Sequence, residues 1–266
     1  LALVRAQIGL GHAVTILTTD AGLSPGDSHP EIDLQWIKQG PLTALGTLGN
    51  ASVLYVKNRF PRVAERGKFF TPRLTAPGVL ARLPSSLDVA HFHEVHIPGY
   101  RRAAGEFTSR GAMVCVSPHG SLLPPTHRGV KRLAHRCLDP LLRAGWFSRC
   151  GAYFALCRAE REQLLRCGVP EAKIHIIPHG LPEWDSCHPT SLPFPVATNP
   201  AVTTFLVLGR LHWSKGVIRV FDAFSTLWER GLRFRLLFCG PDEGCAAILQ
   251  AGCLRRGIPF DTSCIG

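Results

Sequence analysis

The fold is decided by the stretch Phe205-Leu-Val-Leu-Gly-Arg-Leu-His-Trp-Ser-Lys-Gly-Val217. Its apolar start, 205–208, predicts a buried strand, which ends at the pair Gly209-Arg210. From Val217 onward apolar residues recur at helical spacing, which predicts a helix over 217–230. The stretch is therefore expected to form a strand, a tight loop and a helix.

Two cations, Arg210 and Lys215, lie in this loop and at the start of its helix. The first turn of a helix presents free backbone N–H groups and the positive end of the helix dipole, so it favours an anion. Together with Gly209 and Gly216, the two cations predict a pocket for a phosphate or diphosphate. The residues alone leave open the alternative of a solvated loop with two surface cations.

The pattern G-R-L-x-x-x-K-G before an amphipathic helix resembles the donor-binding loop of GT-B glycosyltransferases of the large retaining family 4. Three further segments resemble that family and follow in its order; they are Val116-Ser-Pro-His-Gly120, Ile176-Ile-Pro-His-Gly180 and Leu236-Leu-Phe-Cys-Gly-Pro-Asp-Glu-Gly244. In the second of them, His179 stands where the family usually has Asn. The resemblance implies an α/β protein with a GT-B-like fold of two Rossmann-like domains.

The resemblance also implies a function, the transfer of a sugar from a nucleotide-diphosphate donor to an acceptor with retention at the anomeric carbon. Such reactions build polysaccharides or glycolipids, so the expected acceptor is a sugar or a lipid-linked sugar. Gly209, Arg210, Lys215 and Gly216 would bind the donor diphosphate, whose charge Arg and Lys can stabilise without a metal. No cofactor is expected. A nucleotide-sugar epimerase or a non-catalytic remnant of a GT-B protein are the alternatives.

Histidines lie at several predicted strand ends, where open α/β sheets bind their ligands. The strand expected over 113–117 ends in Pro118-His119-Gly120, and the matching histidine of the family reaches the transferred sugar or the acceptor. His119 is therefore the expected catalytic residue. The strand expected over 87–93 ends in a segment that resembles one facing the family's interdomain cleft. The residues expected to line that cleft are His93, Gly120, His179, Gly240 and Pro241.

The composition limits the class of partner. The 266 residues carry a net charge of +11, which favours an anionic partner such as nucleotide phosphates or anionic lipid. The aromatic residues do not interleave with the cations as stacking platforms would, so no nucleic-acid partner is expected. His93 and His96 lack a third ligand at metal-binding spacing, so no metal site is expected either.

The cysteines and the hydropathy pattern bear on location. The ten cysteines form no C-x-x-C pair, and residues such as Cys115 and Cys239 lie in apolar patterns. This predicts buried free thiols in a reducing cytoplasm. No run is long and apolar enough to span a bilayer, and we expect no signal peptide. The protein is therefore expected in the cytoplasm, peripheral at the cytoplasmic face of the membrane.

Two stretches are strongly basic. Residues 58–82 contain Arg59, Arg62, Arg66, Lys68, Arg73 and Arg82, most of which are expected to be solvated. Residues 128–149 mix six cations with apolar residues, and Pro140 should kink or divide their helix. A basic amphipathic surface suits an anionic membrane face. An ordinary helix packed on the sheet with solvated cations is the alternative.

The remaining pattern predicts two domains, 1–198 on the acceptor side and 199–266 on the nucleotide-sugar side, joined by the Pro-rich linker 192–200. Residues 21–50 are expected to be mostly loop, with one short strand at 32–37. The other expected elements are helices at 1–10, 159–167 and 245–256, and strands at 13–18, 153–156, 173–177, 233–239 and 259–265. Compared with the family, the first strand and a downstream two-Glu motif are absent. We therefore expect a segment cut at both ends, inactive and prone to associate when expressed alone.

Overall fold

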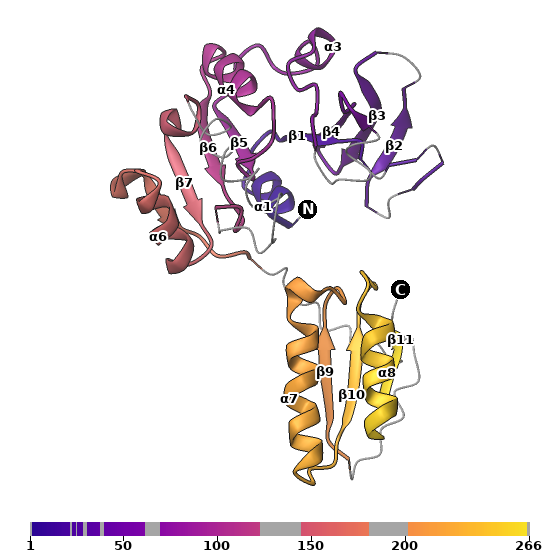
Figure 1. Cartoon of the computed structure of the whole chain (residues 1–266). Helices are drawn as coiled ribbons and strands as arrows, with labels where there is room; N and C mark the ends of the chain where they lie inside the picture. Colours follow the sequence, from indigo (N-terminus) through magenta and orange to yellow (C-terminus); the bar gives the residue numbers. More distant parts are fainter. Residues whose placement is uncertain are drawn as a thin grey trace. The chain divides into compact units, whose positions relative to one another are not determined.

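The computed structural model describes residues 2–21, 23–24, 26–28, 31–37, 40–61, 70–122, 145–180 and 202–264. The chain forms two compact units, Leu1–Trp184 and Asp185–Gly266, in which strands alternate with helices (Figure 1). This confirms the predicted α/β class and its Rossmann-like strand and helix arrangement. The predicted linker and the boundary at 198–199 lie outside the described residues, so the exact boundary stays a prediction.

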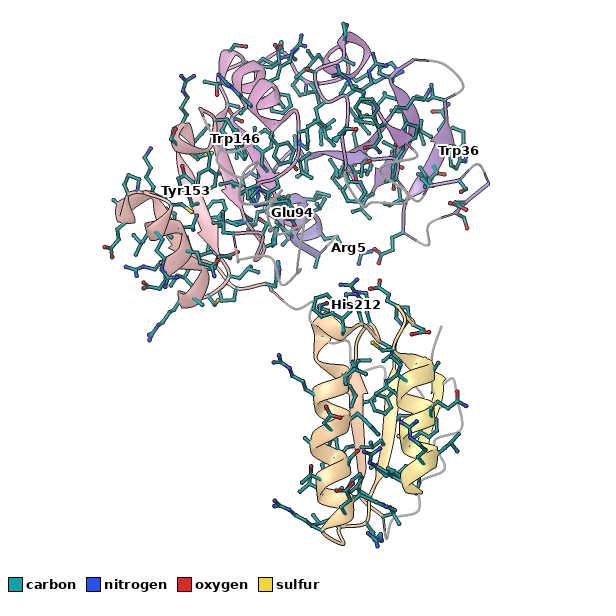
Figure 2. The ribbon with its side chains drawn as sticks, in the orientation of Figure 1. Arg5, Trp36, Glu94, Trp146, Tyr153 and His212 are labelled. Atoms are coloured by element: carbon teal, nitrogen blue, oxygen red, sulfur yellow. The ribbon has the colours of Figure 1, made fainter. Side chains whose placement is uncertain are left out.

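The first unit contains a fully parallel sheet with the strand order β5-β6-β7-β8. Helices α4 and α6 follow β5 and β7 in the chain and pack on this sheet. Trp146 and Tyr153 lie in its core (Figure 2). Leu164 of α6 is buried in the same core. All four predicted strands and the helix at 159–167 are confirmed within two residues, whereas the pattern of α4 was not recognised. The bounds are β5 Val89–His93, α4 Tyr100–Ser109, β6 Met113–Ser117, β7 Ala152–Ala155, α6 Arg158–Arg166 and β8 Ile174–Ile176, with short 3-10 turns at Phe147–Arg149 and Glu171–Lys173.

A second sheet of the first unit is mixed, with the order β1-β4-β3-β2. Strand β1 runs parallel to β4, whereas β3 pairs antiparallel with β4 and β2. The bounds are α1 Ala2–Gly9, β1 Thr15–Thr19, β2 Asp33–Trp36, β3 Leu42–Leu48, β4 Ala51–Val56 and α3 Pro77–Leu80.

The expectation that 21–50 is mostly loop is wrong, because β3 occupies 42–48 and forms a hairpin with β4. Leu48 pairs with Ala51, which leaves the two-residue turn Gly49-Asn50. Alternate residues of β3 are buried from Leu42 to Leu48. This alternation and the Gly-Asn turn are hairpin signals, but the high Gly, Pro and Ser content of the region favoured a loop instead.

The second unit is a parallel sheet of order β11-β10-β9 with helices α7 and α8. The bounds are β9 Thr204–Leu208, the 3-10 turn η3 Trp213–Lys215, α7 Val217–Glu229, β10 Arg235–Cys239, α8 Ala246–Arg256 and β11 Phe260–Cys264. The predicted strands and helices are confirmed. The prediction that 205–208 is buried is wrong, because β9 is an edge strand and Leu206 and Leu208 are 57% and 79% exposed. The central strand β10 is buried.

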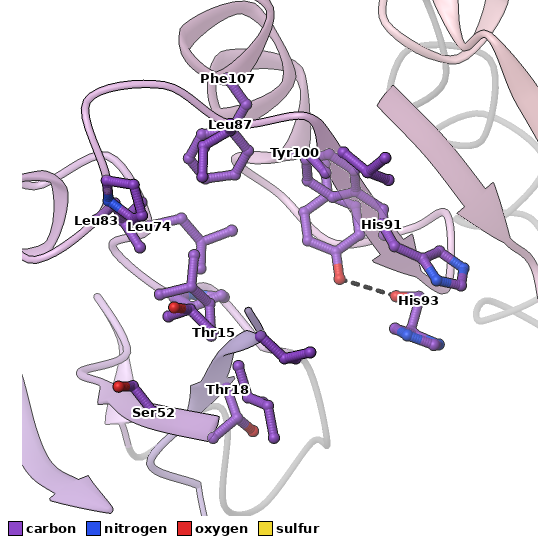
Figure 3. A pocket seen from close by; sticks show the side chains of 18 of the residues that line it. Thr15, Thr18, Ser52, Leu74, Leu83, Leu87, His91, His93, Tyr100 and Phe107 are labelled. Atoms are coloured by element: carbon purple, nitrogen blue, oxygen red, sulfur yellow. Dashed lines mark hydrogen bonds between the residues drawn. The ribbon is translucent and has the colours of Figure 1, made fainter. Parts of the chain in front are cut away.

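Strands β1 and β5 of the first unit are both edge strands among the described residues. A cavity of about 580 Å³ is lined by the consecutive residues 13–19 and 89–93 (Figure 3). Because side chains alternate between the two faces of a strand, lining by consecutive residues means that strand edges face the cavity. Edges with unpaired backbone groups are templates for pairing with another chain.

We therefore expect the 266-residue chain to associate through these edges. Replacing Val89, which is 52% exposed at the β5 edge, by lysine should weaken association about two- to fivefold, because a charge opposes edge pairing. Sedimentation velocity over a range of concentrations measures this. Leu254→Lys, at a 69% exposed position on α8, is the matched control. Equal association of Val89→Lys and the unmodified chain would contradict the expectation.

Candidate functional site

Three of the predicted cleft and catalytic histidines come together in the first unit. His93 ends β5, His119 follows β6, and His179 follows β8. The Nδ1 atom of His93 lies 2.7 Å from Nε2 of His119, and the two rings are stacked with centroids 5.0 Å apart. His179 stacks on His119 at 5.1 Å. We call His91, His93, His119 and His179 the histidine cluster.

His119 is held in an unusual backbone conformation. Its φ of 52° is in the left-handed region, which non-glycine residues rarely adopt, and Gly120 follows with a φ of 78°. The buried carboxylate of Glu160, at the start of α6, accepts hydrogen bonds from the backbone N–H of Gly120 at 2.6 Å and of Leu156 at 2.7 Å. Glu160 thereby ties the His119 loop to the start of α6. Backbone strain kept in place by surrounding contacts is a frequent property of functional sites.

Burial lowers the pKa of three of the four histidines of the cluster. It lowers the pKa of His91 to about 4, with smaller contributions from the neighbouring His93 and His119. Burial also lowers the pKa of His93, helped by His119 and His179, and the pKa of His119, helped by His179 and opposed by Glu160. The hydrogen bond between His93 and His119 needs one bare ring nitrogen, so the two rings are not both protonated. His91, His93 and His119 are therefore expected to be mainly neutral near pH 7.

The depressed pKa of His91 predicts acid sensitivity. Unfolding restores the ordinary imidazole pKa of about 6.5, so below that pH the unfolded chain binds protons that the folded chain does not. The stability that depends on neutral His91 is present above about pH 6.5 and is lost as the pH falls toward about 4. His91→Gln can keep the hydrogen bond to Ser117 Oγ and should show a shallower fall. Thermal melts from pH 7.5 to 4.5 measure this, and parallel curves for the two proteins would contradict it.

In the second unit, the loops after β9 and β10 run side by side. Gly209 N–H donates to Cys239 O at 2.8 Å and Leu211 N–H to Pro241 O at 2.8 Å. A Cβ at Gly240, whose φ is 137°, would lie 2.2 Å from the carbonyl oxygen of Gly209, so no side chain fits there. The predicted site residues Gly209, Gly240 and Pro241 thus form one close backbone contact. It fixes the loop that carries Arg210 and Lys215.

The two helix starts of this unit differ. At the N-terminus of α8, Asp242 Oδ1 accepts hydrogen bonds from the N–H groups of Gly244, Cys245 and Ala246 at 2.9, 3.0 and 3.0 Å. These bonds, led by the one from Ala246, hold the pKa of Asp242 below its usual value. At the N-terminus of α7, the N-cap is Gly216 with a φ of 73°, and no described side chain caps it. Of the two, α7 is the helix start left open to an external anion.

The two cations of the predicted donor loop are exposed. Lys215 has no ion pair or hydrogen bond from its ammonium group within the described residues, and it lies in η3 just before Gly216. Arg210 is paired through its Nη1 with both carboxylate oxygens of Glu243, at 2.9 and 2.7 Å. His212 lies at the same end of α7 and accepts from the N–H of Ser214 at 3.3 Å (Figure 2). An anion at this loop would therefore compete with Glu243 for Arg210.

Two acidic residues that contact the predicted site residues, Glu160 and Glu243, were not predicted from the sequence. Each looks like an ordinary polar residue, in the first turn of a helix or in a loop. The expected burial of Cys115 and Cys239 is confirmed. His96 Nε2 lies 2.8 Å from the carbonyl oxygen of Ser121. No three His, Cys, Asp or Glu side chains of the described residues gather in a way that could hold a metal ion.

The family model for Glycosyltransferase Family 4 matches residues 1–183, which include the whole histidine cluster. The chain belongs to glycosyltransferase family 4. The match ends close to the end of the first unit, so the donor loop in the second unit stays a prediction from its motif. A search of curated proteins found no match.

Membership of glycosyltransferase family 4 gives the chain a glycosyltransferase domain and implies a sugar donor and an acceptor as partners. Among the described residues, no helix is long and apolar enough to cross a membrane. Residues 128–144 of the predicted basic amphipathic stretch lie outside the described residues, so the predicted membrane contact stays a prediction.

Proposed function

We propose that this family 4 glycosyltransferase moves a sugar from a nucleotide-diphosphate donor to a sugar or lipid-linked acceptor, with retention at the anomeric carbon. The observation that carries the proposal is the loop between β9 and α7. This loop contains Arg210 and Lys215 and leads into the uncapped start of α7. Two cations and free backbone N–H groups suit the diphosphate of a nucleotide-sugar.

In this proposal, the donor loop acts on the leaving group. Cleavage of the bond between the sugar and the diphosphate leaves negative charge on the diphosphate oxygens, and fixed donors aimed at that charge lower the barrier. Arg210 and Lys215 supply this charge stabilisation without a metal ion. Glu243 holds Arg210 in place when no anion is bound and gives way to the diphosphate.

His119 acts on the acceptor or the transferred sugar. Its lowered pKa keeps the ring neutral near pH 7, so it can accept a proton from an acceptor hydroxyl. His93 fixes the tautomer of His119 through their hydrogen bond, and Glu160 holds the loop that carries it. We propose that the reaction belongs to polysaccharide or glycolipid synthesis and takes place at the cytoplasmic face of the membrane.

The test uses protein expressed from the whole reading frame that encodes these residues. It is incubated with a panel of UDP- and GDP-sugars and a mixture of sugar and polyprenyl-linked acceptors. Products are followed by mass spectrometry. Release of nucleoside diphosphate together with a new glycoside supports the proposal. An epimerised donor would indicate a nucleotide-sugar epimerase, and nucleotide binding without any product would indicate a non-catalytic protein.

A further inference from the structure

The first unit has a second hollow, which is lined by cations and by no residue of the histidine cluster. Its volume is about 550 Å³. Three arginines from three separate segments line it, namely Arg59 after β4, Arg73 before α3 and Arg102 on α4. Among the described residues that line it, none is acidic. Arg59 and Arg73 belong to the basic stretch whose cations the sequence predicted to be mostly solvated.

Arg59 and Arg73 stand on a fixed backbone. Arg59 N–H donates to Thr71 O at 2.9 Å and Arg73 N–H to Lys57 O at 3.1 Å, so the two segments pair antiparallel. The buried side chain of Asn58 holds the pair together. Its Nδ2 donates to Asp20 Oδ1 at 2.8 Å, and its Oδ1 accepts from Thr71 N–H at 2.9 Å. Two cations are thus placed at the hollow before any ligand arrives.

The third side of the hollow is the start of α4. Pro98 and Gly99 line it, Gly99 is the N-cap with a φ of 100°, and no described side chain caps this helix. The first turn of α4 contains Arg101 and Arg102 and no acid. Cations near a helix N-terminus oppose the helix dipole and are unfavourable unless an anion is present. An anion bound in the hollow would offset this unfavourable placement of cations at the start of α4.

Within the described residues, none of the guanidinium groups of Arg59, Arg73 and Arg102 makes a hydrogen bond or an ion pair. Guanidinium groups bind phosphate oxygens in pairs of parallel hydrogen bonds, which makes arginine the preferred residue for phosphate recognition. We propose that the hollow binds the phosphate or diphosphate group of a ligand, either a soluble sugar phosphate or a phospholipid headgroup. This site is in the other unit from the donor loop and does not rest on the proposed function.

The experiment removes the donor loop's own anion binding first. Inorganic diphosphate is titrated by calorimetry into the full chain carrying Arg210→Ala and Lys215→Ala. In that background Arg59→Gln with Arg73→Gln should weaken binding about a hundredfold, and Arg102→Gln alone about tenfold, since each lost charged hydrogen bond weakens binding roughly tenfold. Arg166→Gln, at an exposed arginine on α6, is the matched control and should leave the affinity unchanged. Circular dichroism checks that all variants fold.

A second arm separates the two sources of phosphate. Vesicles of phosphatidylglycerol and of neutral phosphatidylcholine are sedimented with the same proteins. The site is assigned to a headgroup if the protein binds the anionic vesicles, if diphosphate competes with this binding, and if the variant with Arg59→Gln and Arg73→Gln loses it. Diphosphate binding without such vesicle binding assigns it to a soluble phosphate. Absence of diphosphate binding, or equal binding by the arginine variants and the control, would overturn the proposal.

Discussion

Replacing His119 by alanine is expected to lower the rate of sugar transfer by about 10²–10⁴-fold, the usual contribution of one positioned proton-transfer group. The reason is that His119 has a lowered pKa and a fixed hydrogen bond to His93 at the carboxyl end of β6. The variant is made in protein from the whole reading frame. Turnover with the best donor and the free energy of unfolding are both measured for the variant and for the unmodified protein. Turnover should fall strongly, whereas the free energy of unfolding should change little.

His119→Gly is the matched variant, because it removes the same ring and relieves the left-handed backbone at a φ of 52°. It should be about 1 kcal/mol more stable than His119→Ala and equally impaired in turnover. Two variants that differ in stability but share the loss of activity would separate chemistry from folding. Full turnover in either variant would mean that His119 is structural.

Replacing Arg210 or Lys215 by alanine is expected to weaken UDP or GDP binding by roughly 1.5–3 kcal/mol each, as for a lost charge-assisted hydrogen bond. This corresponds to about 10- to 150-fold in the dissociation constant. Lys215 lies just before the uncapped start of α7, whose free N–H groups favour an anion, and Arg210 lies in the same loop. Calorimetric titration of the nucleotide into each variant measures the loss.

Glu243→Gln is the informative contrast, because it frees Arg210 from its ion pair and removes a negative charge from the loop. Nucleotide affinity should rise by a few fold, since exposed ion pairs contribute about 0.2–1 kcal/mol. A gain in Glu243→Gln with losses in the two cation variants fits a diphosphate site. Unchanged affinity in both cation variants would remove the donor-loop assignment.

The parts of the fold that the sequence predicted best are those with a strong local pattern. The strand and helix around Gly209–Gly216 and the strand that ends at His119 combine an apolar run with glycine or proline at its end, and both are confirmed. The sequence also predicted histidines at strand ends, where open α/β sheets bind their ligands. Their order in the sheet, and so their contacts, was not predictable without the strand pairing.

The parts that the sequence missed depend on contacts between distant segments. Glu160 matters because its carboxylate meets the N–H of Gly120, forty residues away, and Glu243 because it meets Arg210. The exposure of β9 reflects its position at the sheet edge, which an apolar run does not reveal. In the hollow, Arg59 and Arg102 come together only through the folded backbone. A single sequence carries no local signal for such pairings.

Retaining sugar transfer is tested most directly by a proton NMR time course of protein, nucleotide-sugar and acceptor in one tube. The donor's anomeric signal should decay while a glycoside signal of the same anomeric configuration grows in equal amount. His119→Ala should slow both changes together. A product of inverted configuration, or a donor that changes only into its epimer, would rule out retaining transfer by this protein.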